Sequence, residues 1–144
     1  MRPATSSPQL LAVEHFVRLI TEIVGPNSTL ESRVRRFCPL AINADGYIFA
    51  GGDPLGGPVG ALRSTDKGGT WQPVNNGLTT GNDINALIAT VNGYLFAGSY
   101  GDGVFRSSDN GDNWIQVNNG LTALFVLSFA TDASGDILAG TLFW

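Results

Sequence analysis

Few side chains in this sequence have the chemistry of a catalytic or metal-binding group. The only histidine is His15 and the only cysteine is Cys38. A histidine-based triad or a histidine–cysteine metal cluster therefore cannot be assembled. A disulfide within the chain is impossible, so the redox compartment stays open. We expect Cys38, which precedes Pro39, to be a small buried apolar residue. The sequence predicts no catalytic nucleophile and no cofactor.

The remaining candidates for chemistry are carboxylates. The stretch at 109–113, Asp-Asn-Gly-Asp-Asn, is rich in oxygen atoms like a calcium-binding loop, but it lacks the complete series of ligands and the distal Glu of such loops. A sister stretch 43 residues earlier has Lys67 and Gly69 where this one has Asn110 and Asp112. A calcium site would therefore exist in only one of the two copies, and we predict no metal site.

A glycine-rich stretch spans residues 51–60. A phosphate-binding loop would be followed by a helix and a Lys-Ser or Lys-Thr pair, and neither is expected here. The stretch instead interrupts a repeat, because its counterpart at 100–102 is shorter. Surface loops of this kind often carry contacts. We therefore predict a contact loop formed by Asp53, Pro54, Leu55 and Pro58.

The two sister stretches belong to one longer pattern, Arg-Ser-x-Asp-x-Gly-x-x-Trp, which starts at Arg63 and at Arg106. Each copy separates two strand-like runs, which predicts a hairpin turn. The Asp can accept hydrogen bonds from backbone N–H groups further along, the Gly can adopt a positive φ, and the Trp can fold back over the turn as an apolar anchor. We predict a structural role for Ser64, Asp66, Gly68, Trp71, Ser107, Asp109, Gly111 and Trp114.

The repeat extends beyond this motif. The tail Val-Asn-Asn-Gly-Leu-Thr occurs at 74–79 and at 117–122, and related strand-like runs start at Gly46, Gly93 and Gly135, in steps of 47 and 42 residues. We expect strands at 38–43, 46–52, 60–64, 70–74, 84–90, 93–99, 103–107, 113–117, 125–131 and 135–142. A period near 42 with about four short strands in each unit is typical of β-propeller blades.

The motif resembles the Asp-box of bacterial neuraminidase repeats. The longer unit is similar to the repeats of propellers related to photosystem II assembly factors and to sortilin-type domains, and the resemblance covers roughly residues 37–144. It implies a β-propeller in which the box lies on the hairpin between the third and fourth strands of a blade. In that family this hairpin lies at the blade periphery, away from the central ligand site.

The resemblance also bears on enzymatic activity. Sialidases with this fold use several arginines around a carboxylate, together with a Tyr/Glu pair and an acidic proton donor. Residues 37–144 contain only the arginines Arg63 and Arg106 and no Glu. We therefore expect no glycosidase activity and no enzyme, and we expect the two arginines to bind carbonyl or carboxylate groups of neighbouring blades.

The first 36 residues form a different kind of sequence. Apolar residues recur at three- and four-residue steps after Ser7-Pro8, which predicts an amphipathic helix at about 8–24, ended by Gly25-Pro26. A capping box at 28–31 predicts a short second helix at about 29–36. The sequence thus predicts a helical leader, 1–36, before the β region 37–144. The helix could cover a blade face, dock on another chain or lie at a membrane surface.

The number of blades is unusual. The sequence predicts a mainly β fold with about two and a half four-stranded blades, at 37–78, 79–121 and, in part, 122–144. An incomplete β-propeller of this size cannot close, since propellers have at least four blades. Three alternatives stay open: a fragment of a longer propeller, a ring of several copies, or an open stack capped by the helices.

Charge and hydropathy restrict the partners. Residues 37–144 carry three basic side chains against nine Asp, a net charge of −6, which argues against nucleic acid. No run of about 18 apolar residues occurs, so we expect a soluble chain with no membrane span. Charged residues interrupt the apolar positions of the leader and no signal peptide is evident. The compartment stays undetermined, and the family resemblance would also allow an extracytoplasmic one.

Two functions fit these observations. The first is a non-catalytic interaction or scaffold module that binds a protein or associates with itself. The second is a carbohydrate-binding propeller related to the sialidase-type repeats, with Tyr47, Tyr94 or Tyr100 contributing to grooves between blades. Fold alone does not decide between them.

Overall fold

The computed structural model describes residues 39–52, 60–79 and 83–143, and this part of the chain consists of β-strands joined by turns. The strands are β1 (Leu40–Ile42), β2 (Ile48–Gly51), β3 (Ala61–Ser64), β4 (Gln72–Pro73), β5 (Ile84–Ala89), β6 (Leu95–Ser99), β7 (Val104–Ser107), β8 (Ile115–Gln116), β9 (Phe125–Thr131) and β10 (Ile137–Leu142). Each lies within a range predicted from the sequence, and the prediction of a mainly β fold is confirmed.

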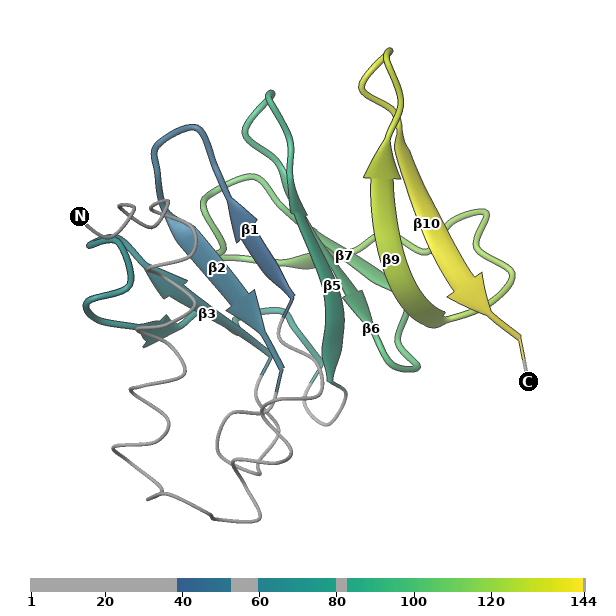
Figure 1. The fold of residues 1–144 in the computed structure, drawn as a ribbon. Helices are drawn as coiled ribbons and strands as arrows, with labels where there is room; N and C mark the ends of the chain where they lie inside the picture. Colours follow the sequence, from purple (N-terminus) through teal and green to yellow (C-terminus); the bar gives the residue numbers. More distant parts are fainter. Residues whose placement is uncertain (1–38, 53–59, 80–82, 144) are drawn as a thin grey trace, which may run out of the picture.

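The strands form three antiparallel sheets. The first has the order β1-β2-β3-β4, the second β5-β6-β7-β8, and the third consists of β9 and β10. Figure 1 shows them side by side in sequence order, with the first sheet at the left and β10 at the right. None of the three sheets closes on itself.

Several predictions from the sequence fall outside the described residues. These are the helices at about 8–24 and 29–36, the contact loop with Asp53, Pro54, Leu55 and Pro58, and the side chains of His15 and Cys38. Within the ranges that are described, no helix has the length and apolar character needed to cross a membrane.

The first two sheets are built in the same register. Ile48 of β2 lies opposite Ser64 of β3, and Leu95 of β6 lies opposite Ser107 of β7. In both sheets the serine that begins the Asp-containing turn is thus the last residue of the third strand. The repeat seen in the sequence is therefore a repeat of strand pairing.

Neighbouring sheets approach closely at glycines. A Cβ atom at Gly51 of β2 would lie 2.7 Å from Cγ2 of Ile84 of β5. At Gly98 of β6 a Cβ atom would overlap Val126 of β9. Both apolar side chains are fully buried by this packing, and burial of a side chain of this size stabilises a fold by about 1.5–3 kcal/mol. Small residues in β2 and β6 thus allow the next sheet to approach.

Candidate functional site

The first Asp-containing turn, Ser64–Trp71, connects β3 to β4. Asp66 accepts hydrogen bonds at Oδ1 from the Thr70 backbone N–H (2.7 Å) and the Ser64 hydroxyl (2.8 Å), and at Oδ2 from the Thr70 hydroxyl (2.7 Å). The Gly68 N–H donates to Ser64 Oγ at 2.8 Å. Both carboxylate oxygens of Asp66 are therefore used to hold its own turn.

The second turn, Ser107–Trp114, repeats this network between β7 and β8. Asp109 accepts from the Asn113 N–H (2.8 Å), from Asn113 Nδ2 (2.7 Å) and from the Ser107 hydroxyl (2.8 Å). The Gly111 N–H donates to Ser107 Oγ at 2.9 Å. Asn113 thus supplies with its amide the hydrogen bond that a hydroxyl supplies in the first copy.

The backbone of both turns is left-handed at two successive residues. Lys67 and Asn110 each have a φ of +58°, and the glycines that follow them, Gly68 and Gly111, have φ values of +89° and +86°. Asn adopts this conformation more readily than Lys, since its short polar side chain can bond locally. The glycine of the motif is required because a side chain at a second consecutive left-handed position would add strain.

The hydrogen bonds keep both carboxyl groups ionised. The Thr70 backbone and hydroxyl donors lower the pKa of Asp66 to about 2, and the Asn113 side-chain and backbone donors lower the pKa of Asp109. A carboxyl group held in its charged form near neutral pH is a poor general acid. The geometry therefore fits the structural role predicted for the two aspartates.

These pKa shifts predict a loss of stability in acid. Because folding lowers the pKa of Asp66 from 3.8 to about 2, its contribution is fully present above about pH 4 and is lost as the pH falls toward 2. In Asp66→Asn one oxygen remains to accept hydrogen bonds, and the side chain cannot titrate. Urea unfolding at several pH values should show a smaller loss of stability for Asp66→Asn than for the unchanged protein over this window. A parallel decline of the two proteins would contradict the assignment.

The two tryptophans of the motif differ in their partners. The Trp71 indole N–H donates to Gly68 O of its own turn at 3.2 Å. The Trp114 indole N–H instead donates to Val74 O of the first sheet's tail at 2.8 Å, and the Trp114 backbone N–H donates to Asn76 O, also at 2.8 Å. The second turn is therefore docked on the first sheet, which the sequence analysis did not predict.

Arg63 of β3 completes this docking contact. Its Nη1 donates to Asn110 O at 2.8 Å and to Asp112 Oδ1 at 2.7 Å. Asn43, from the turn between β1 and β2, donates to Asn110 Oδ1 at 2.8 Å. The prediction that Arg63 binds a carbonyl or carboxylate of the neighbouring unit is confirmed. Its buried Nε has no hydrogen-bond partner among the described residues, so the contacts described for the guanidinium are made by Nη1.

Arg106, the repeat equivalent of Arg63, has a different environment. Its guanidinium carbon lies 5.2 Å from the centre of the Tyr94 ring, a cation–π contact. It forms no ion pair within the part of the chain that the structure describes. Among the described residues no turn equivalent to Ser107–Trp114 lies beside Arg106, so a carbonyl or carboxylate partner in a neighbouring unit stays a prediction for this arginine.

The repeated tail has a role that sequence reasoning missed. Asn75 Oδ1 accepts from the Ala61 N–H at 2.7 Å, and Asn118 Oδ1 accepts from the Val104 N–H at 2.8 Å. Each asparagine thus binds the start of the third strand of its own sheet. The occurrence of the same tail in both copies was the signal that could have revealed this contact.

Oxygen atoms of the acidic stretch at 109–113 are engaged in these networks. Asp109 holds its own turn, and Asp112 pairs with Arg63. The described residues contain no group of three or more His, Cys, Asp or Glu side chains that could hold a metal ion.

The comparison with known proteins found no matching family model and no matching curated protein.

The third sheet exposes large apolar side chains. Leu138 of β10 is 58% exposed and Phe143, just after β10, is 67% exposed; Leu124, Leu127 and Leu142 are also exposed. Single apolar residues on a surface are ordinary, but a group of them on one element is typical of an interaction surface. This surface and the docking contacts above are the candidate functional features of the described chain.

Proposed function

We propose that the chain is a non-catalytic module of the Asp-box β-propeller type, which binds another protein or associates with itself. Two properties support the propeller assignment: the first two sheets share one strand order and one register, and the turn between β7 and β8 docks on the preceding sheet. Asp66 and Asp109 serve their turns, so the repeated motif acts as a structural element in this proposal.

The observation that carries the binding role is the group of exposed apolar side chains in and next to the third sheet. Leu138 and Phe143 would bury apolar area in an interface, and each Å² of such area contributes about 25 cal/mol. The outer edge of β10 also has no strand beside it within the described residues. An open edge with apolar side chains favours the addition of a segment from another polypeptide.

Selection from a displayed random-peptide library tests this role. We expect the full chain to enrich peptides rich in apolar residues, and Leu138→Asp to lose them, because a buried charge at the interface would be unpaired. Val91→Asp, in the turn before β6, serves as a control at an exposed apolar residue away from the third sheet. Absence of enrichment, or peptides that bind Leu138→Asp and Val91→Asp equally, would contradict a binding role for β10.

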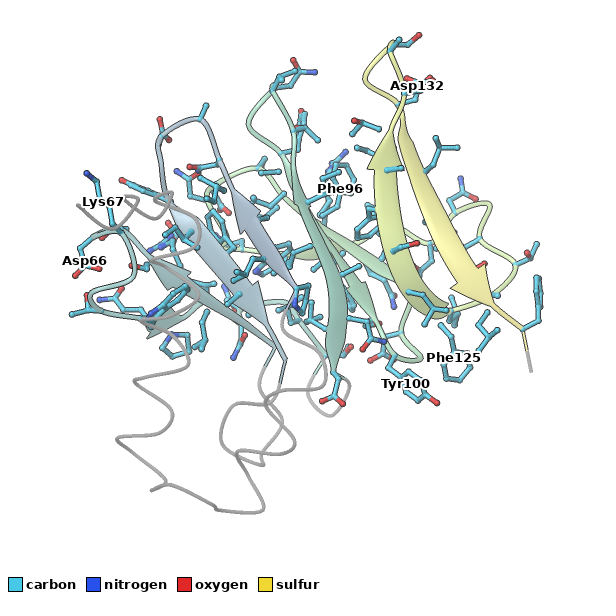
Figure 2. The ribbon with its side chains drawn as sticks, in the orientation of Figure 1. Asp66, Lys67, Phe96, Tyr100, Phe125 and Asp132 are labelled. Atoms are coloured by element: carbon cyan, nitrogen blue, oxygen red, sulfur yellow. The ribbon has the colours of Figure 1, made fainter. Side chains whose placement is uncertain are left out.

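A carbohydrate-binding module is the second candidate, and one observation favours it. Tyr94 and Tyr100 are 39% and 45% exposed and could stack on sugar rings, whereas Tyr47 packs against the apolar core. Tyr100 also lies edge-on to Phe125 at 4.9 Å between ring centres, as their neighbouring positions in Figure 2 indicate. Binding of the full chain to a glycan array, lost in Tyr100→Ala, would favour this second function.

A further inference from the structure

The contact between the first two sheets defines a receptor surface on the first. Its components are the Arg63 guanidinium, the carbonyl oxygens of Val74 and Asn76, and Gly77. Gly77 has a φ of +90°, and a Cβ atom there would overlap the carbonyl oxygen of Trp114. The glycine is thus the point at which the docked turn lies against the backbone of the first sheet.

The second sheet carries the same receptor residues in the same order. Arg106, Val117, Asn119 and Gly120 stand 43 positions after Arg63, Val74, Asn76 and Gly77. Gly120 has a φ of +86° like its counterpart, but nothing described lies within 4 Å of where its Cβ would be. Gly120 therefore has the backbone conformation that Gly77 has beneath the docked turn, but no described turn is docked on it.

The two surfaces also differ in how deeply an equivalent phenylalanine is buried. Phe49 of β2 is fully buried, and a Cβ atom placed on Gly111 of the docked turn would lie 3.5 Å from its ring. Its equivalent in β6, Phe96, packs on Phe129 of β9 at 6.5 Å between ring centres but is only half-buried. Figure 2 shows Phe96 on the side of the second sheet that faces β9. The cover on Phe49 that the docked turn provides is absent at Phe96.

In the third sheet, no strand among the described residues lies beside β10 on the side away from β9. In the first two sheets the second strand pairs with a third strand that ends in Arg-Ser, with Phe49 opposite Arg63 and Phe96 opposite Arg106. Leu138 occupies the equivalent position in β10 and is exposed. A strand beside β10 would therefore place an Arg opposite Leu138, and the turn after it would reach the receptor surface of the second sheet.

We infer that β10 and the surface formed by Arg106, Val117, Asn119 and Gly120 together bind a hairpin of the Arg-Ser-x-Asp-x-Gly-Asp-x-Trp type. This inference rests on the proposed function and names the chemistry of its partner. The hairpin pairs with β10, its Trp indole donates to Val117 O, and its second Asp pairs with Arg106. The pairing corresponds to that of β7 with β6 in the second sheet, and the other two contacts are those that the β7–β8 turn makes with the first sheet.

A second copy of this chain fits the surface less well. The hairpin that it would offer, β3–β4, has Lys67 and Gly69 at the positions of Asn110 and Asp112. Docking would bring Lys67 toward Arg106 and remove the carboxylate that pairs with the arginine. Figure 2 shows Asp66 and Lys67 at the end of the first sheet away from β10. Like charges close together oppose association, so the β7–β8 type of hairpin is the better occupant.

Two cyclic peptides test this preference with the full chain. One contains residues 103–118 and the other residues 60–75, each closed by a short glycine linker so that the hairpin is preformed and less ordering is lost on binding. Fluorescence anisotropy of the labelled peptides gives their affinities. We expect the 103–118 peptide to bind saturably and more tightly than the 60–75 peptide, and a 103–118 peptide with Ala in place of Trp114 to bind poorly.

Variants of the full chain locate the bound peptide. Gly120→Ala should weaken binding at least about tenfold, since its Cβ would occupy the place of the hairpin carbonyl. Gly135→Ala is the matched control: it has the same φ of +86° and the same open space, but lies in the turn between β9 and β10. Arg106→Ala should weaken the 103–118 peptide more than the 60–75 peptide, which lacks the second Asp.

The outcomes separate this inference from the proposed function. Equal or tighter binding of the 60–75 peptide, or a discrete oligomer of the chain by light scattering, would overturn it in favour of a second copy as occupant. Failure of both peptides, with library peptides still bound through Leu138, would overturn the hairpin and leave the proposed binding role. Failure of peptides and library together would overturn both. Equal loss in Gly120→Ala and Gly135→Ala would also overturn the docking geometry.

Discussion

Replacing Trp114 with alanine is expected to lower the free energy of unfolding by about 3–5 kcal/mol, the usual cost of deleting a large buried aromatic side chain. Trp114 is only 3% exposed and belongs to the apolar cluster shared by the first two sheets. Its indole N–H also donates to Val74 O at 2.8 Å, so the substitution removes a hydrogen bond between the sheets as well. Urea unfolding followed by circular dichroism measures the change.

The repeat provides a matched control for this substitution. Trp71 has the same place in the motif, but it is half-buried and its indole bonds within its own turn. Trp71→Ala should therefore cost less, about 1–2 kcal/mol. If the two alanine variants lost equal stability, the docking of the second turn on the first sheet would not be the source of the difference.

The local chemistry of the turns could be predicted from the sequence. The spacing of Ser, Asp and Gly specified a turn held by its own side chain, and Asp66 and Asp109 form that network. The limits of the strands were also predictable, because glycines and turns bound each apolar run. Such contacts join residues within four positions of one another, so a short stretch of sequence contains all of their atoms.

The contacts between sheets could not be predicted in the same way. The motif suggested that each Trp folds back over its own turn, which describes the indole of Trp71 but not that of Trp114, whose partner Val74 lies 40 residues away. Tryptophans at the same position of the motif thus have different partners, because among the described residues only the second turn packs against another sheet. Arg63 and Arg106 differ for the same reason.

Gly77→Ala is expected to be the second most disruptive substitution. Both Gly77 and Gly120 have a positive φ, and alanine in that conformation costs about 1–2 kcal/mol at either position. At Gly77 the new methyl group would also overlap the carbonyl oxygen of Trp114. Relief of the overlap must move the turn away from the first sheet, which weakens the Trp114 N–H bond to Asn76 O and the burial of the indole.

Comparison with Gly120→Ala isolates this overlap from backbone strain. In the full chain without added peptide, nothing described lies within 4 Å of the Gly120 Cβ position, so its alanine variant should show the strain alone. We expect Gly77→Ala to be less stable than Gly120→Ala by about 2–4 kcal/mol, from lost packing and a lost hydrogen bond. Equal unfolding midpoints in urea would mean that the two sheets do not approach at Gly77. A larger loss for Gly120→Ala would mean that its surface is already covered in solution, and the hairpin would then have no place to bind.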